Sequence, residues 1–111
     1  MDKKTVEQYI LEMPNAVLEY PFGEDVAVYK VGGHMFALMS EKKTPINLSL
    51  KCDPKLSEVL REEYESVMPG YHLNKKHWNT IVLTGQMSWE DVQGLIRHSY
   101  ILVSGADATH A

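Results

Sequence analysis

With 111 residues, 44% of them hydrophobic, and a formal net charge of −4, the chain has the size and apolar content of one folded domain, which excludes an intrinsically disordered protein. The single cysteine, Cys52, excludes an intrachain disulfide and favours a reducing, cytoplasmic location. Neither an apolar signal core nor a run of about 20 apolar residues is present, so we expect no membrane partner. The negative net charge argues against non-specific binding of nucleic acid through overall electrostatic attraction. A local basic face is still permitted by Lys42-Lys43, Lys51, Lys55 and Lys75-Lys76.

A first helix is followed by a turn-rich segment. Apolar residues recur at helical spacing from Val6 to Met13, and Pro14 closes the helix because proline cannot continue it. The segment 15–25 carries turn residues around Tyr20 and Phe22, whose rings we expect to be buried. We therefore interpret it as a link without a strand.

Three strands are predicted next. Two runs with β propensity, 26–31 and 34–40, flank Gly32-Gly33, and glycines accept the positive φ that a two-residue hairpin turn demands. The run 45–51 alternates, with one face carrying Ile46, Leu48 and Leu50 and the other Asn47, Ser49 and Lys51. This alternation is typical of a strand with one buried face and one solvent-exposed face.

Two helices and a further strand complete the chain. Asp53 is a favourable N-cap and Pro54 a favourable first residue for a helix with a buried stripe of Leu56, Val59, Leu60 and Tyr64. A short extended piece is expected around 71–73, and a clear strand at 78–84. Ser88 caps the last helix and Gly105 stops it; the inner face carries Val92, Leu95, Ile96, Ser99, Tyr100 and Val103. We expect residues 106–111 to be frayed.

The element order α-β-β-β-α-(β)-β-α predicts a single α+β domain over residues 1–111. Short links favour a mainly antiparallel sheet, and three amphipathic helices bury their stripes by covering one sheet face, which gives two layers. Because side chains alternate along a strand, a polar set is expected on the sheet face that the helices leave open. Its members are Lys30, Asn47, Ser49, Lys51, Trp78, Thr80 and Thr84. The simpler interpretation is a solvated sheet face with a partly covered tryptophan. The same face would also suit single-stranded nucleic acid or a protein partner.

The segment 69–80 is the strongest candidate for a functional site. It contains two histidines, two lysines, two aromatic residues and two asparagines. Lysine, histidine and asparagine donate to anions, and an aromatic ring offers a stacking surface. The candidate nucleic-acid contacts are Tyr71, His72, Lys75, Lys76, His77, Trp78 and Asn79. The alternative is an ordinary polar turn in which Tyr71 packs, His72 pins the loop and the lysines are solvated.

Metal binding and catalysis lack a supporting pattern. The sequence has no Cys-x-x-Cys and no His-x-x-x-His spacing, and His72 and His77 lie five residues apart across a loop, which determines no ligand geometry. Cys52 precedes a helix cap without an evident base to activate it. We therefore expect no metal, no cofactor and no enzymatic activity.

The residues also carry a family resemblance over essentially the whole chain. The matching segments are Tyr20-Pro21-Phe22-Gly23, Tyr29-Lys30-Val31, Phe36-Ala37, Asn47-Leu48, 69–80 and 95–100, of which the Tyr-His…Lys-x-His-Trp block is the most specific. In these segments the chain resembles the MmcQ/YjbR family of small bacterial proteins. The resemblance implies a secretion-chaperone-like or CyaY-like α+β fold and the family's usual description as predicted DNA-binding proteins.

The sequence therefore predicts a cytoplasmic, monomeric, non-enzymatic protein that binds DNA through the loop Tyr71–Asn79. One alternative is a protein- or peptide-binding adaptor that uses the open sheet or a helix face. Another is a small-molecule pocket near Tyr20, Phe22, His72 and Trp78.

Overall fold

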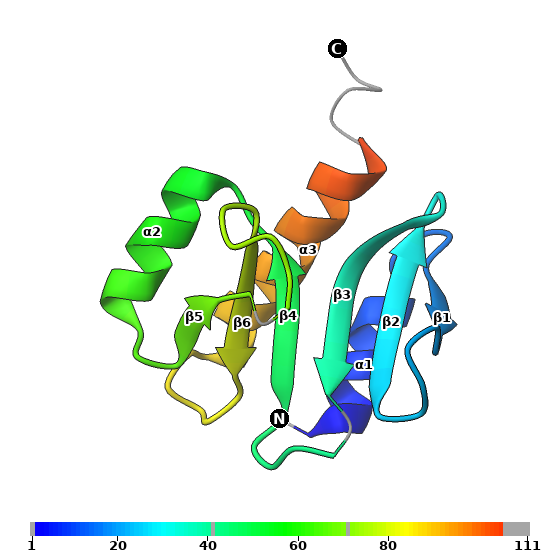
Figure 1. Cartoon of the computed structure of the whole chain (residues 1–111), viewed down its shortest axis with the longest axis horizontal. Coiled ribbons are helices and arrows are strands. Elements are labelled where there is room, and N and C mark those ends of the chain that lie inside the picture. The colour runs from blue at the N-terminus through cyan, green and yellow to red at the C-terminus, as the bar shows by residue number, and fades with distance from the viewer. Residues whose placement is uncertain (1, 41, 71, 106–111) are drawn as a thin grey trace.

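The computed structural model describes residues 2–40, 42–70 and 72–105, which form three helices and six strands (Figure 1). The helices are α1 (Lys3–Leu11), α2 (Pro54–Glu63) and α3 (Trp89–Ser104). The strands are β1 (Val17–Glu19), β2 (Val26–Val31), β3 (His34–Ser40), β4 (Asn47–Lys51), β5 (Val67–Pro69) and β6 (Trp78–Val82). The predicted α+β class is confirmed.

The strands form one antiparallel sheet in the order β1-β2-β3-β4-β6-β5. Helices α1 and α3 lie behind this sheet, and α2 lies beside its β5–β6 end (Figure 1). Leu48 pairs with Ile81, and both are buried in the core between sheet and helices. Ser49 pairs with Thr80 on the opposite face, as the predicted alternation requires.

Side-chain caps explain where the helices begin. The Asp53 carboxylate accepts from the backbone N–H groups of Lys55 and Leu56, and the Ser88 hydroxyl accepts from that of Asp91. Both predicted caps are confirmed. The Asp2 carboxylate accepts from the Thr5 N–H at 2.8 Å, and this hydrogen bond lowers the pKa of Asp2.

Four elements differ from the sequence prediction in their presence, position or end. The segment 15–25 contains β1, which has only three residues and exists because it pairs with β2, so no periodic pattern announces it. The short extended piece expected around 71–73 is instead β5, at Val67–Pro69, where Pro69 is tolerated because the strand lies at the sheet edge. β6 ends at Val82, and α1 ends at Leu11.

Three apolar side chains are more exposed than predicted. Tyr20 and Phe22 are 44% and 66% exposed because their segment does not enter the core between sheet and helices. Val59 is 48% exposed, since α2 turns Ser57 inward and buries only a narrow stripe beside the sheet. The predicted inner face of α3 is confirmed, with Val92, Ile96 and Ser99 buried.

Candidate functional site

The loop between β5 and β6, here the β5–β6 loop (residues 70 and 72–77 of the described chain), has its shape held by Asn74. Its side-chain oxygen accepts from the N–H groups of Lys76 at 2.9 Å and His77 at 3.3 Å. Its backbone carbonyl accepts from the Trp78 N–H at 3.0 Å. An asparagine that bonds the backbone two residues ahead favours a turn over a strand, which explains why this segment is not extended.

Arg61, on α2, holds the same loop from outside. Its Nε donates to the Asn79 side-chain oxygen at 2.8 Å, and its Nη2 donates to the backbone carbonyls of Lys75 and Trp78. A guanidinium suits this role because its donors form a rigid planar fork. Sequence reasoning missed Arg61; the available signal was one arginine on a helix whose other exposed charges are mostly glutamates.

The structure separates the seven predicted contact residues. Trp78 and Asn79 are only 8% and 2% exposed, so they present little surface to a ligand. Asn79 faces the helix layer because it pairs with Leu50, and its Nδ2 is buried without a hydrogen-bond partner. A Cβ added at Gly70 would lie 2.7 Å from the Trp78 Cβ, so the chain packs tightly over this tryptophan.

Three of the remaining residues are exposed. His72, Lys75 and Lys76 reach solvent, and His77 is half-buried. The Lys75 Nζ donates to the Gly70 carbonyl at 3.1 Å in a partly buried hydrogen bond, although Lys75 as a whole is exposed. Tyr71 lies outside the described residues. Among its described residues, the loop thus brings several cationic or donor groups together, while the ring of Trp78, which was predicted to stack, is buried.

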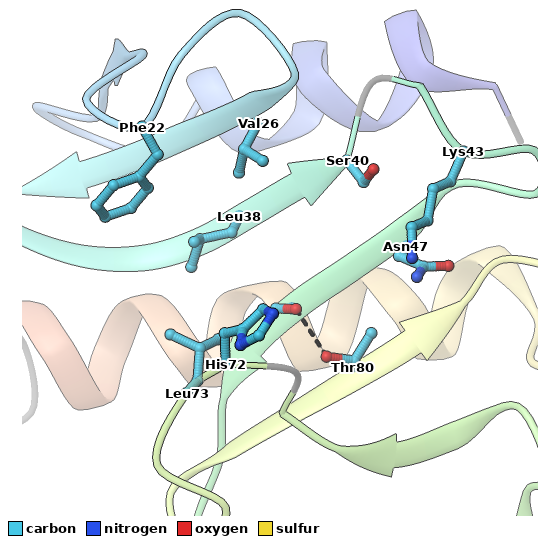
Figure 2. Close-up of a pocket in the computed structure, with 10 residues that line it drawn as sticks. Phe22, Val26, Leu38, Ser40, Lys43, Asn47, His72, Leu73 and Thr80 are labelled. Atoms are coloured by element: carbon cyan, nitrogen blue, oxygen red, sulfur yellow. Dashed lines mark hydrogen bonds between the residues drawn. The ribbon is translucent and has the colours of Figure 1, made fainter.

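His72 adopts an unusual backbone conformation. Its φ is 59°, in the left-handed region that costs an L-residue about 1–2 kcal/mol. Figure 2 shows its imidazole directed into a pocket on the sheet face opposite the helices. Such strain persists only where surrounding contacts impose it and is found disproportionately at functional sites.

This pocket, here the sheet-face pocket, has a volume of about 380 Å³. It lies between the segment that carries Phe22, the segment that carries Lys43, and the β5–β6 loop (Figure 2). The lining residues are Phe22, Val26, Leu38, Ser40, Lys43, Asn47, Ser49, His72, Leu73 and Thr80. The hypothesis of a pocket near Phe22 and His72 therefore corresponds to a real cavity, whereas Trp78 and Tyr20 are not among these residues.

The floor of the pocket is the polar face of β4 and β6. The Ser49 and Thr80 hydroxyls form a 2.8 Å hydrogen bond, and these residues are 8% and 1% exposed (Figure 2). The part of the predicted open face at Ser49 and Thr80 is therefore covered, because the segments that carry Phe22 and Lys43 and the β5–β6 loop surround it.

Cys52 sits on the helix side of the sheet and is 3% exposed. Burial raises the pKa of its thiol, and the neighbouring Asp53 carboxylate raises it further. A protonated, buried thiol is a poor nucleophile. Among the described residues, no group of three or more histidine, cysteine, aspartate or glutamate side chains is arranged to hold a metal ion.

None of the helices in the described ranges combines the length and apolar character needed to cross a membrane.

Comparisons with known proteins place this fold and loop in a family. The family model of YjbR matches residues 11–102. The Escherichia coli O157:H7 protein YbdF, described as uncharacterized, is 38% identical over 107 residues, which cover 93% of this chain and 88% of YbdF. YjbR of Escherichia coli K12, also described as uncharacterized, is 33% identical over 93 residues, 84% of this chain and 79% of that protein. The chain belongs to the YjbR family.

Solved structures show the same fold. A crystal structure of a Deinococcus radiodurans protein with a DUF419 domain is 40% identical, with a TM-score of 0.88, and the match covers 91% of this chain and 77% of that one. A Pseudomonas syringae protein, at 24% identity and a TM-score of 0.80, shares the fold over 93% of this chain and 99% of its own.

Proposed function

We propose that this protein is a cytoplasmic nucleic-acid-binding protein, not an enzyme, and that the β5–β6 loop contacts phosphates. The observation that carries the proposal is the grouping of exposed His72, Lys75 and Lys76 on one loop. Phosphate contacts fix a protein on a nucleic acid without reading its sequence. The description of the MmcQ/YjbR family as predicted DNA-binding proteins supports the same assignment.

The bracing of the loop strengthens this proposal. Arg61 binds two loop-region carbonyls, and Asn74 binds two loop N–H groups, so the lysines project from an ordered backbone. An ordered loop loses less conformational entropy on binding than a free one. Because Trp78 is buried, its ring presents little surface for base stacking, and we assign the affinity to phosphate contact.

Salt dependence tests this proposal. A site that makes about three phosphate contacts loses roughly 40-fold in affinity between 50 and 200 mM salt. We would titrate labelled duplex and single-stranded DNA with the protein and follow fluorescence anisotropy at both salt concentrations. The Lys75→Ala/Lys76→Ala variant should bind about tenfold more weakly at the lower salt and show a flatter salt slope.

The matched control is Lys3→Ala/Lys4→Ala, which removes the same charge from α1. If both double variants weaken binding equally, the loop has no special role. If the folded wild-type protein does not bind at 50 mM salt, the nucleic-acid proposal is wrong.

A protein-binding adaptor is the second candidate. Val59 and Met68 are 48% and 40% exposed on α2 and β5, which contact one another. Exposed apolar side chains on adjoining elements are typical of a surface that a protein partner covers. Such a contact should be nearly insensitive to salt, in contrast to phosphate binding.

A further inference from the structure

The sheet-face pocket is polar at one end and apolar at the other. Figure 2 shows Phe22 and Leu73 on one side and Ser40, Lys43 and Asn47 on the other. The rest of the lining consists of Val26 and Leu38 together with His72, Ser49 and Thr80, and most of the lining surface is apolar. A ligand that matches this lining has an apolar body and a polar head.

The hydrogen bonding of the floor favours an apolar body over a nucleobase. Ser49 and Thr80 hydrogen-bond to one another, which uses one of their two hydroxyl hydrogens within the protein. A base would bury several donors and acceptors against Val26, Leu38 and Leu73, where they would lack partners. Unpaired polar groups buried in this way weaken binding.

The charges around the polar end favour an anionic head. Lys43 contributes a cation, and none of the described lining residues is acidic. The nearby Lys42 Nζ pairs with the Asp25 carboxylate at 3.1 Å. This ion pair connects the segment that carries Lys43 to the segment that carries Phe22. His72 adds an imidazole to the lining, a group that donates a hydrogen bond from a ring N–H.

The dimensions favour a small molecule over a peptide. A volume of about 380 Å³ lies at the lower end of the range for small-molecule sites. Phe22, although it lines the pocket, is 66% exposed, so its ring has apolar surface left to bury against an occupant. We propose that the sheet-face pocket binds a small amphipathic anion, a ring or branched apolar group that carries a carboxylate or sulfonate, with the head at Lys43 and the body between Phe22 and Leu73.

Two fluorescent probes test the proposal directly. Anilinonaphthalene sulfonate has an aromatic body with an anionic head, and phenylnaphthylamine has the same rings without the sulfonate. We expect the sulfonate to bind one saturable site on the wild-type protein and the neutral probe to bind the same site more weakly. Phe22→Ala should weaken both probes about tenfold, because each loses apolar contact. Lys43→Met should weaken the sulfonate about fivefold and leave the neutral probe unchanged.

Matched controls separate the pocket from general surface effects. Met68→Ala removes an exposed apolar side chain outside the pocket, and Lys55→Met removes an exposed lysine outside it. Both controls should bind the probes as the wild type does. Amide NMR spectra of each variant check that the fold is intact, and Phe22 is exposed enough that its removal should leave the fold unchanged.

Several results would overturn the proposal. One is that neither probe binds the wild-type protein at a saturable site. Another is that Phe22→Ala and Met68→Ala lower probe affinity equally. A third is that Lys43→Met lowers the affinity of the charged and neutral probes equally. The Lys75→Ala/Lys76→Ala variant should retain probe binding, because neither lysine lines the pocket. His72 and Leu73 belong both to the β5–β6 loop and to the pocket, but the Lys43 variant and the Lys75/Lys76 variant test the two proposals through different residues.

Discussion

At the scale of single residues, His72 combines a strained backbone with a position at the pocket. Its φ of 59° is a conformation that glycine adopts without the clash of a Cβ atom. We predict that His72→Gly is more stable than His72→Ala by about 1 kcal/mol. Both variants lose the imidazole, so the comparison isolates the backbone, and urea unfolding measures it.

The control for this comparison is Lys76, an exposed loop residue without a positive φ. There the order should reverse, because glycine loses more conformational entropy than alanine on folding. If glycine is no better than alanine at position 72, the backbone there is not strained in solution.

The buried thiol of Cys52 predicts how the stability of the protein depends on pH. Burial raises the pKa of its thiol in the folded protein above the ordinary value of 9.0, which the thiol keeps in the unfolded chain. Between the unfolded-state pKa and the raised folded-state pKa, the unfolded chain therefore loses a proton that the folded protein keeps. The unfolded state then binds fewer protons, and stability falls as pH rises above 9.0, by at most about 1.4 kcal/mol per pH unit.

Cys52→Ala lacks this group, so the stability gap between wild type and variant should shrink from pH 8 to pH 10.5. Chemical denaturation at several pH values measures the gap. A gap that stays constant over this range would show that the thiol ionises at its ordinary pKa in the folded protein.

Residue types alone identified the β5–β6 loop as a candidate site, because its donors are concentrated in a dozen positions. Composition did not reveal which of those donors reach solvent. Asn79 turns inward because it pairs with Leu50, and Trp78 is covered by the close approach of Gly70. Both facts depend on contacts between segments, which a local pattern does not contain.

At the scale of elements, the coupling between α2 and the β5–β6 loop depends on Arg61. Arg61→Ala removes three hydrogen bonds and leaves the buried Asn79 oxygen without its donor. We expect a loss of about 2–3 kcal/mol in the free energy of unfolding. Faster amide exchange at Lys75 and Lys76 should accompany it, since the loop loses its anchor.

Arg97→Ala is the matched control, because Arg97 is an exposed helix arginine that donates to the Tyr9 hydroxyl. Arg97→Ala should lower the free energy of unfolding by less than about 1 kcal/mol and leave amide exchange in the β5–β6 loop unchanged. Equal effects of the two substitutions would argue against a specific role for Arg61.

Alternation and caps allowed the long elements to be predicted, namely β2, β3, β4 and the last two helices. The short strands β1 and β5 were not predicted in place, because three residues contain too little periodicity and depend on a neighbouring strand for their hydrogen bonds. For a related reason, the pocket that the sequence predicted near Phe22 and His72 was incomplete, because its wall at Lys43 was not predicted. Its walls come from residues near 22, 43 and 72, and only the sheet topology brings them together.

At the scale of the whole molecule, the net charge of −4 does not decide nucleic-acid binding. The longest dimension of the protein is 36 Å, which is several times the Debye length of about 10 Å at 0.1 M salt. Charges far from the β5–β6 loop are therefore screened, and the local balance matters most. Locally, Glu62 and Glu63 are exposed on α2, next to the Arg61 that binds the loop.

This reasoning predicts that Glu62→Gln/Glu63→Gln increases affinity for DNA by about threefold at 50 mM salt, because two nearby negative charges no longer repel phosphates. The gain should shrink at 200 mM salt. Glu12→Gln/Glu90→Gln changes the net charge by the same amount but acts from the C-cap of α1 and from α3, the two helices behind the sheet (Figure 1), and should have a smaller effect. Anisotropy titrations of both variants measure the difference. Equal gains would mean that the total charge, and not the local field at the loop, governs binding.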